Sequence, residues 1–200
     1  MSHFFAFLSR MKFIQRWGLM RNTVTENIQE HSLQVGMIAH GLAQIRNAYF
    51  GGTLDCGKVA LFGMYHEVSE VFTGDLPTPV KYFNPQIKTV YHEIEGMAQQ
   101  KLFQLLPEQL KSGYSHILIR REEDAELWRI VKAADKLSAY LKCVEELKVG
   151  NQEFASACKQ IKQELQESKL PEVDYFMKVF APGFSLTLDE LSHQEGKAQE

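Results

Sequence analysis

The chain has 200 residues, of which 44% are hydrophobic and 24% are charged, and its formal net charge is −3 at pH 7. This length is typical of one globular domain with a substantial core. The charge balance gives no basic surface for a nucleic-acid polymer, and no apolar run is long enough to span a bilayer, so we expect neither kind of partner.

The first long helix is expected over residues 28–45. Its inward face is marked by residues that recur at steps of four and three: His31, Val35, Ile38, Leu42 and Ile45. This spacing is typical of one face of an amphipathic helix. Upstream of it, Asn22, Thr23 or Thr25 can supply the side chain that caps the N-terminus of the helix.

A second helix is expected over residues 58–72, after the turn segment "FGGTLDCG". It is apolar on nearly every side, so we expect it to be the buried, central helix. The segment that follows, "TGDLPTPVKYFNP" (73–85), contains three prolines and cannot be the interior of a helix.

Three more amphipathic helices are expected in the second half of the chain, over residues 87–105, 122–147 and 151–168. No long stretch alternates between apolar and polar residues, so no strands are expected. The polar end "SHQEGKAQE" is typical of a frayed terminus. We therefore predict one all-α domain, a helical bundle over residues 1–185, followed by a frayed tail over residues 186–200.

The cysteines favour a reducing, cytoplasmic location. Cys56, Cys143 and Cys158 are odd in number and widely spaced, so they fit neither a disulfide framework nor a CxxC metal site. The apolar N-terminal stretch is interrupted by Arg10 and Lys12 and has no small-residue cleavage site, so we expect no signal peptide.

Two histidines are expected to face the core. His31 lies on the apolar face of the first helix, whereas His40, nine positions later, points to the solvent. In the second helix, His66 and Glu70 are four residues apart and share a face. Glu67 lies about 100° round from His66, which is near enough to converge on the same point in front of that face.

A further carboxylate is expected to face inward from the helix over 122–147. Asp135 shares a face with Leu127, Val131 and Ser138. Two histidines and two or three carboxylates, carried by three helices, are therefore expected to point into the protein. Burying charge is costly unless the charge is paired or binds a metal.

Each of these residues alone has an ordinary structural explanation. His31 could be a hydrogen-bonded core residue, Glu67 could form a salt bridge with a lysine, and Asp135 could pair with Lys132 or Lys136. Taken together, the imidazoles and carboxylates suit a divalent transition metal such as Mn, Fe, Co or Zn. Such a metal can lower the pKa of a bound water to near neutrality.

Longer motifs around these residues carry a family resemblance. They are "RW" (16–17), "RNTVTENIQEHSLQV" (21–35), "YHEVSEVFTGDLPTPVKYF" (65–83) and "KAADKLSAYLKCVEEL" (132–147). The order of a histidine, a histidine followed by an acid, and a distant aspartate resembles the HD-domain metal-dependent phosphohydrolases. The motifs together resemble the bacterial 5'-deoxynucleotidases of the YfbR type, and the resemblance covers nearly the whole chain.

This resemblance implies a helical bundle of the HD-domain type that acts as a cytosolic homodimer. It also implies one divalent transition metal, such as cobalt or manganese, as cofactor. The implied reaction is the hydrolysis of deoxyribonucleoside 5'-monophosphates to a deoxyribonucleoside and phosphate.

The resemblance also implies roles for individual residues. The metal ligands would be His31, His66, Glu67 and Asp135. Glu70 would handle the proton for the leaving sugar oxygen, and Arg16 would grip the phosphate. The residues expected to contact the nucleotide are Arg16, Trp17, His31, Glu67, Asp75, Leu76, Pro77, Thr78 and Asp135.

General chemistry agrees with several of these roles. A phosphate monoester needs cationic clamping before it accepts a nucleophile, and the planar guanidinium of Arg16 can bind two phosphate oxygens. Trp17 against the sugar would offer a steric reason to refuse a 2'-hydroxyl. Each residue has a plainer alternative: a solvated surface charge for Arg16, a core or interface contact for Trp17, and a turn-forming aspartate for Asp75.

Glu67 departs from the family pattern, which has aspartate directly after the second histidine. The carboxylate of glutamate reaches about 1.5 Å further than that of aspartate, and active-site geometry is sensitive to about 1 Å. The helix could sit further back and keep the metal, the metal preference could shift, or the site could be weakened. We favour retained metal binding, because the other motif positions match.

The leading hypothesis is therefore a metal-dependent phosphatase that acts on deoxyribonucleoside 5'-monophosphates. A rival within the same superfamily is a phosphodiesterase or alarmone hydrolase, which would need a wider pocket and more basic residues near the metal. A rival from another class is a non-catalytic nucleotide sensor, in which Glu67 would mark lost chemistry.

Overall fold

The computed structural model describes residues 1–81 and 83–193, and over this part of the chain it confirms the all-α prediction. Among these residues, β structure is limited to one isolated antiparallel bridge between Gln15 and Asn27. Short 3-10 helices cover Ser9–Phe13, Glu122–Asp124, Gln152–Phe154 and Ala181–Ser185. The α-helices are α1 (Phe4–Leu8), α2 (Ile28–Tyr49), α3 (Cys56–Tyr65), α4 (Glu70–Thr73), α5 (Thr78–Lys81), α6 (Pro85–Gln104), α7 (Glu108–Leu118), α8 (Ala125–Lys148), α9 (Ala155–Glu167), α10 (Pro171–Val179) and α11 (Leu188–His193).

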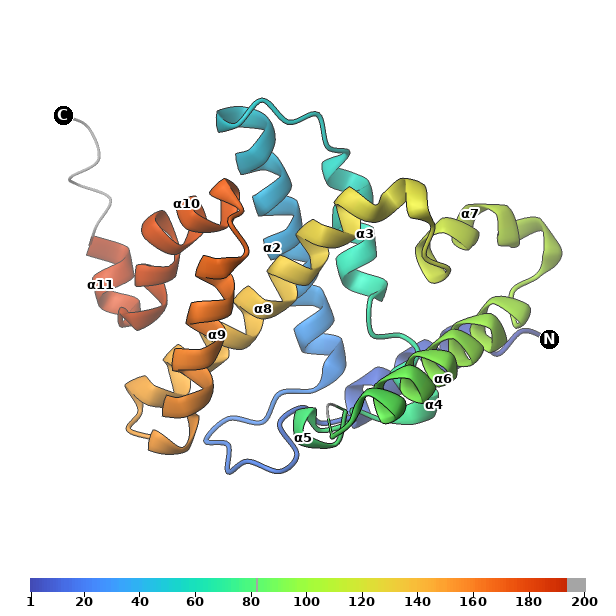
Figure 1. Cartoon of the computed structure of the whole chain (residues 1–200), viewed down its shortest axis with the longest axis horizontal. Helices are drawn as coiled ribbons and strands as arrows, with labels where there is room; N and C mark the ends of the chain where they lie inside the picture. Colours follow the sequence, from blue (N-terminus) through green and yellow to red (C-terminus); the bar gives the residue numbers. More distant parts are fainter. Residues whose placement is uncertain (82, 194–200) are drawn as a thin grey trace.

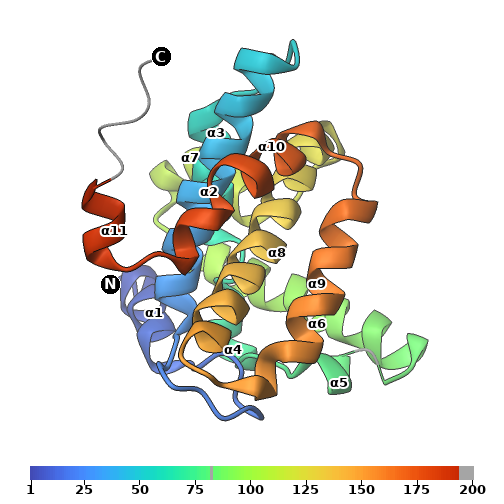
Figure 2. The same ribbon diagram turned by 90° about the vertical axis from the view of Figure 1, so that its left-hand side faces the viewer.

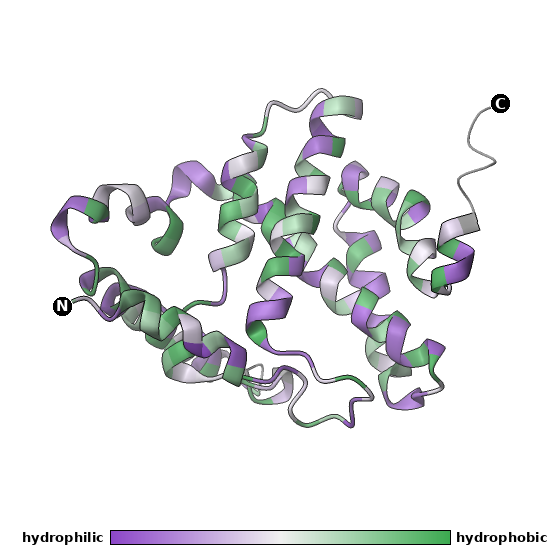
Figure 3. Ribbon diagram, turned by 180° about the vertical axis from the view of Figure 1, so that it is seen from behind, coloured by the Kyte–Doolittle hydropathy of each residue, from purple (hydrophilic) through white to green (hydrophobic). Residues whose placement is uncertain are grey.

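The long helices α2 and α8 form the centre of the molecule (Figure 1). α3 packs against both of them, α9 packs against α8 (Figure 2), and α10 packs against α2. α6 packs against α4 and α5, and in Figure 1 it lies at the opposite side of the molecule from α11. Most helices carry hydrophobic and hydrophilic residues on different sides, as Figure 3 shows, which is the pattern that the sequence predicted.

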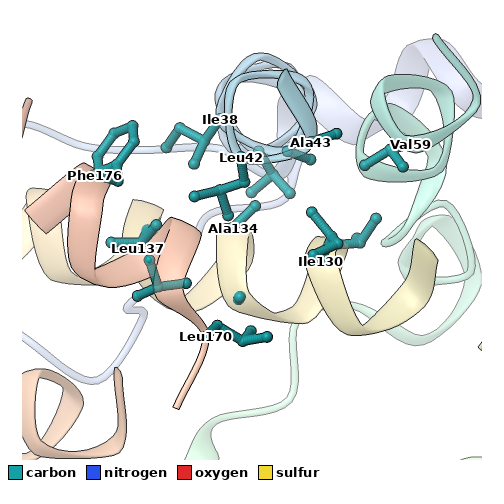
Figure 4. Close-up of a cluster of buried hydrophobic side chains, with 14 of the residues drawn as sticks. Ile38, Leu42, Ala43, Val59, Ile130, Ala134, Leu137, Leu170 and Phe176 are labelled. Carbon is teal, nitrogen blue, oxygen red and sulfur yellow. The ribbon is translucent and has the colours of Figure 1, made fainter. Parts of the chain in front are cut away.

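Two groups of buried apolar side chains hold this arrangement together. The larger group joins α2, α3, α8 and α10, and Figure 4 shows Leu42, Leu137 and Phe176 meeting in it. A fully buried side chain of this size stabilises the fold by about 1.5–3 kcal/mol relative to an exposed one. The smaller group lies beneath the N-terminal segment and consists of Phe4, Met11, Ile28, Val68, Leu102, Leu106 and Leu118.

The start of α2 is fixed by a capping box rather than by the residues that the sequence analysis favoured. The side chain of Asn27 accepts hydrogen bonds from the backbone N–H groups of Gln29 and Glu30, both at 3.0 Å. The carboxylate of Glu30 accepts from the N–H of Asn27 in return, at 3.3 Å. Such a cap contributes about 1 kcal/mol, and it sets the first turn of α2, which carries His31.

The helix expected over residues 58–72 is interrupted, so that prediction was wrong. α3 ends at Tyr65 and α4 begins at Glu70. The carbonyl of Gly63, which a continuing helix would offer to the N–H of Glu67, accepts from Nδ1–H of His66 at 2.7 Å instead. The chain then turns more tightly, with the N–H of Val68 on the carbonyl of Tyr65 and that of Glu70 on the carbonyl of Glu67.

α3 is also less buried than its composition predicted. Its residues Leu61 and Met64 are 40% and 42% exposed, because only one side of α3 packs against α2 and α8. α2 and α8 occupy the central position instead (Figure 1).

Several helices of the described chain lie where the sequence analysis expected none. α1, α7 and α10 were missed altogether, and the one-turn helix α5 lies inside the proline-rich segment, where Pro79 occupies the first turn that proline tolerates. α11 falls within the expected frayed tail over 186–200, of which residues 194–200 lie outside the described residues. The domain boundary at residue 185 stays a prediction.

Two further findings concern helix length and the cysteines. In the described part of the chain, no helix combines the length and the apolar character that crossing a membrane requires. Cys56, Cys143 and Cys158 are free thiols, as their spacing indicated.

The crossing of α2 and α3 depends on two glycines. A Cβ atom added to Gly63 would lie 2.8 Å from the Cα of Gly36 and 2.9 Å from its backbone nitrogen. Backbone atoms cannot rotate away as a side chain can, so Gly63→Ala is expected to push the helices apart. We expect it to lower the free energy of unfolding by about 1–3 kcal/mol, measured by urea denaturation.

Gly41→Ala in α2 is the matched control. A Cβ atom added there meets no heavy atom within 4 Å. Alanine in an open helical position is expected to stabilise the protein by up to about 1 kcal/mol. Equal denaturation midpoints for the two variants would show that the close approach of α2 and α3 does not restrict the size of the side chain at residue 63.

Candidate metal centre

The four residues expected to bind metal come together from three parts of the chain. His31 lies in the first turn of α2, His66 and Glu67 lie in the turn after α3, and Asp135 lies in the middle of α8. Each offers one ligand atom, and these four atoms lie within 4.8 Å of one another. We call these residues the four-residue cluster.

The distances within the cluster suit a single cation. Nε2 of His31 lies 3.0 Å from Oδ1 of Asp135 and 3.7 Å from Oε1 of Glu67. Nε2 of His66 lies 3.7 Å from Oε1 of Glu67 and 3.9 Å from Oδ1 of Asp135. Ligand atoms that bind one metal at about 2.1 Å lie roughly 3–3.5 Å apart, so small adjustments would bring all four onto one ion.

Hydrogen bonds on the far side of both imidazoles orient Nε2 toward the cluster. The hydroxyl of Ser138 donates to Oε1 of Gln34 at 2.5 Å, so it accepts from Nδ1–H of His31 at 3.1 Å. Nδ1–H of His66 donates to the carbonyl of Gly63. The proton on Nδ1 leaves the lone pair on Nε2 available to a metal, which is how proteins orient histidine ligands.

Two buried atoms of the cluster lack a hydrogen-bond partner. Within the described residues, Nε2 of His66 and Oε2 of Glu67 are buried and make no hydrogen bond. Leaving a polar group buried and unsatisfied costs about 1–3 kcal/mol. A cation in the cluster would satisfy Nε2 of His66, so the donor set fits a divalent metal better than it fits a purely structural hydrogen-bond network.

The protonation states also suit a metal. Burial lowers the pKa of His66, although the charges of Glu67 and Asp135 act in the opposite direction. Burial alone would raise the pKa of Asp135, but its close contact with His31 and the charges of neighbouring groups, Arg16 among them, lower it overall. A neutral imidazole and an ionised carboxylate are the forms that bind metal ions.

Arg16 lies beside the cluster because of the short antiparallel pairing near the N-terminus. The N–H of Arg16 donates to the carbonyl of Glu26 at 2.9 Å, next to the bridge between Gln15 and Asn27. Nη2 of the guanidinium lies 3.9 Å from Oδ1 of Asp135, while Nη1 donates to Oε2 of Glu26 at 2.8 Å. Nη2 of the guanidinium therefore faces the cluster, while the hydrogen bond from Nη1 to Glu26 fixes its other side.

Nearby carboxylates keep Arg16 charged. Burial alone would lower its pKa, but the charges of Glu67, Glu26, Asp135 and Asp75 raise it above its ordinary value. A charged guanidinium can bind a phosphate or a carboxylate through two parallel hydrogen bonds.

Trp17 has an unusual backbone conformation. Its φ is 59°, in the left-handed region that bulky residues rarely adopt. The carbonyl of Trp17 accepts hydrogen bonds from the N–H of Met20 at 2.9 Å and from the side chain of Asn22 at 3.3 Å. Its ring packs edge to face on Phe154, with 5.3 Å between the centroids. These contacts hold the half-buried indole in one place.

The loop after Trp17 is anchored to the end of α8. The buried carboxylate of Glu146 accepts from the backbone N–H of Thr23 at 3.0 Å and from its hydroxyl at 2.6 Å, and it forms an ion pair with Lys142. Asn151 donates to the same carboxylate at 2.8 Å. Burial alone would raise the pKa of Glu146, but these hydrogen bonds lower it, so the anchor stays charged.

For the remaining residues of the expected site, the structure gives burial and backbone position rather than side-chain contacts. Glu70 is buried at the start of α4, and its backbone N–H donates to the carbonyl of Glu67. Leu76 and Pro77 are half-buried in the segment that follows Asp75. The backbone of Thr78 begins α5, but its side chain lies outside the described part of the structure. The roles of these residues stay predictions.

Sequence reasoning missed the residues that hold the site residues and the adjoining loop in position through hydrogen bonds. Glu26 contacts Arg16 and Trp17, Gln34 supports His31 through Ser138, and Glu146 anchors the loop. Glu26 and Gln34 lie in the segment 21–35, yet nothing in their spacing distinguished them from surface residues.

The structure also bears on the departure at position 67. Oε1 of Glu67 reaches the cluster, at 3.7 Å from Nε2 of both histidines. Glu67 lies in the tight turn after α3. Retained metal binding with the longer side chain stays a prediction.

Comparison with known proteins gives consistent matches over almost the whole chain. A family model described as YfbR-like, 5'-deoxynucleotidase YfbR-like, matches residues 3–184. A 5'-deoxynucleotidase of Vibrio parahaemolyticus is 54% identical over 191 residues, which cover 96% of this chain and 98% of that protein.

Solved structures confirm the HD-type fold. An HD-domain phosphohydrolase of Listeria innocua has a TM-score of 0.79 and 22% identity, with 95% of this chain and 92% of that chain covered. The HD phosphohydrolase of cyanophage S-2L, solved with dA and one catalytic Zn²⁺ ion, has a TM-score of 0.62 and 22% identity, with 91% and 96% covered.

Proposed function

The chain belongs to the YfbR-like family of 5'-deoxynucleotidases, and we infer from this that it hydrolyses deoxyribonucleoside 5'-monophosphates to a deoxyribonucleoside and phosphate. The observation that carries this function to the site is the guanidinium of Arg16 beside the four-residue cluster, with Nη2 3.9 Å from Asp135. A phosphate held there would meet positive charge from two directions.

We propose that His31, His66, Glu67 and Asp135 hold one divalent metal ion. Nε2 of His66, which is buried and unpartnered within the part of the chain that the structure describes, supports this assignment, and Oε1 of Glu67 lies 3.7 Å from it. When bound, such an ion supplies Lewis acidity and lowers the pKa of a water ligand. Cobalt or manganese is the expected metal by family resemblance, and the cyanophage relative carries zinc.

Arg16 binds and orients the phosphate in this proposal. Its Nη1 is occupied by Glu26, which leaves Nη2 and Nε for two phosphate oxygens. Arginine stabilises the charge that develops on these oxygens during attack. Asp75, Leu76, Pro77 and Thr78 line the pocket that receives the nucleoside.

Glu70 and Trp17 act on the two ends of the sugar. Glu70, buried at the start of α4, delivers a proton to the departing O5' so that the alcohol leaves as a neutral group. Trp17 lies against the deoxyribose, where its rigid indole leaves no room for a 2'-hydroxyl. His31, Glu67 and Asp135 border the phosphate as well as the metal. A cytoplasmic homodimer, with the HD-type domain over residues 1–185, is the expected biological form.

A panel of nucleotides tests this function. We expect the protein supplied with Co²⁺ or Mn²⁺ to release phosphate from dAMP and from other deoxyribonucleoside 5'-monophosphates. Release from AMP is expected to be at least about tenfold slower, because a clash with one hydroxyl is worth on the order of 1–3 kcal/mol. The measurement is phosphate release by malachite green, with EDTA-treated protein as the control.

The rival functions predict different results in the same assay. Turnover of cyclic or pyrophosphorylated nucleotides, without turnover of monophosphates, would indicate a phosphodiesterase or an alarmone hydrolase. Tight nucleotide binding without phosphate release under any metal would indicate a nucleotide sensor. Either result would overturn the proposed function.

A further inference from the structure

We propose that Glu26 is a positioning residue that determines both how tightly this site binds the phosphate and how well it selects deoxyribose over ribose. It does so because one of its carboxylate oxygens holds the two side chains that face the phosphate and the sugar. This inference rests on the proposed function, since it assigns those roles to Arg16 and Trp17.

The contacts of Glu26 support this role directly. Oε2 accepts from Nη1 of Arg16 at 2.8 Å and from the indole Nε1 of Trp17 at 3.2 Å. The side chain of Glu26 is 13% exposed, so water competes little for these bonds. A hydrogen bond to a charged group is worth about 1.5–3 kcal/mol.

The backbone places Glu26 where it can reach both partners. Its carbonyl accepts from the N–H of Arg16 at 2.9 Å, and the carbonyl of Ile14 accepts from the N–H of Ile28 at 3.0 Å. These two bonds flank the bridge between Gln15 and Asn27. Because Asn27 caps α2, the position of Glu26 is set by the same helix that carries His31.

Trp17 needs such a support more than most residues do. A non-glycine residue in the left-handed region costs on the order of 1–3 kcal/mol, and it persists only where its surroundings determine it. The bonds from Met20 and Asn22 act on the backbone of Trp17. The bond from its indole to Glu26 acts on the ring, which is the part that would meet the sugar.

The two residues that Glu26 holds are also in contact with each other. The guanidinium carbon of Arg16 lies 5.8 Å from the centroid of the Trp17 ring. A change in one side chain therefore disturbs the other. Because one oxygen of Glu26 accepts hydrogen bonds from both side chains, the position of the bound phosphate is coupled to the position of the ring that excludes a 2'-hydroxyl.

The role of Glu26 is separable from metal binding. Its Oε1 lies 3.8 Å from Nδ1 of His31, but the proton on Nδ1 goes to Ser138 at 3.1 Å. Removing the carboxylate is thus expected to leave the metal ligands oriented. Metal content should stay the same while substrate selection changes.

The test compares Glu26→Ala and Glu26→Gln with the wild-type protein. We expect Glu26→Ala to raise KM for dAMP about tenfold or more, and to lower the ratio of kcat/KM for dAMP over AMP by a similar factor. Glutamine can present its one oxygen to both donors, so Glu26→Gln is expected to keep most of this ratio. Metal content by elemental analysis is expected to equal that of the wild type in both variants.

Glu153→Ala is the matched control, because Glu153 holds Arg21 in the same loop at 3.0 Å. It should leave the dAMP to AMP ratio unchanged. Trp17→Phe removes the indole donor, so the effect of Glu26→Ala on the ratio should be largely absent in that background. If Glu26→Ala did not fold, Glu26→Gln and Trp17→Phe would still show whether the carboxylate acts through the ring.

Several outcomes would overturn the inference. One is an unchanged dAMP to AMP ratio in Glu26→Ala, and another is an equal loss in Glu26→Gln and Glu26→Ala. Binding of dAMP and AMP by calorimetry gives the same ratio without turnover. Wild-type protein that binds but does not hydrolyse would contradict the proposed function alone, whereas wild-type protein that binds neither nucleotide would contradict both.

Discussion

His31→Ala is expected to remove the bound metal and to lower phosphate release from dAMP by about 10³-fold or more. A metal ion contributes several kcal/mol to such a reaction, and each 1.4 kcal/mol is about tenfold in rate. His31 lies at the centre of the cluster, with Nε2 3.0 Å from Asp135 and 3.7 Å from Glu67. The two measurements are metal content per chain by elemental analysis and the initial rate of phosphate release.

His40→Ala is the matched control for this variant. His40 is on the same helix, nine residues further along, and its side chain is exposed. We expect it to keep full metal content and full activity. Wild-type metal content in His31→Ala would refute the assignment of the cluster as the metal site, whatever the rate.

Glu70→Gln is expected to lower kcat for dAMP by about 10²- to 10⁴-fold, the usual contribution of a general acid. KM and metal content are expected to stay near the wild-type values. Glutamine fills the same buried space at the start of α4 but has no acidic proton to give to O5'. The measurement is steady-state kinetics with metal content determined on the same sample.

The leaving group offers a sharper version of this test. An analogue of dAMP with sulfur in place of O5' loses a thiolate, which needs no proton in order to leave. Glu70→Gln is therefore expected to hydrolyse this analogue at close to the wild-type rate. Glu93→Gln, on the exposed side of α6, is the control and should behave as wild type with both substrates. An equal loss on both substrates would mean that Glu70 acts in some other way.

The helical architecture could be predicted where apolar residues recur regularly. The stripe of His31, Val35 and Leu42 gave α2 almost its correct bounds, and the face of Asp135 in α8 was correct. α7 and α10 were missed because they are short, at 11 and 9 residues, so a helical period repeats few times within them. The break after Tyr65 was missed because it depends on a bond from His66 to the carbonyl of Gly63.

The candidate site likewise has one part that the sequence predicted and another part that it did not predict. The four-residue cluster was predicted because histidines and carboxylates on apolar faces are costly to bury without a purpose. The support behind it was not predicted. Glu26 has no periodic position, and its importance follows from a single antiparallel bridge that brings residues 14–16 next to residues 26–28.

The amino-acid sequence by itself determined the all-α class, the inward direction of the cluster residues and the membership of a family. These properties depend on local spacing and on residue type. Only the tertiary structure decided how the site is held, because the partners of Arg16, Trp17 and His31 are carboxylates and hydroxyls that become neighbours only when separate segments are packed together. Burial then turns these ordinary polar groups into strong and specific contacts, since little water is left to compete for them.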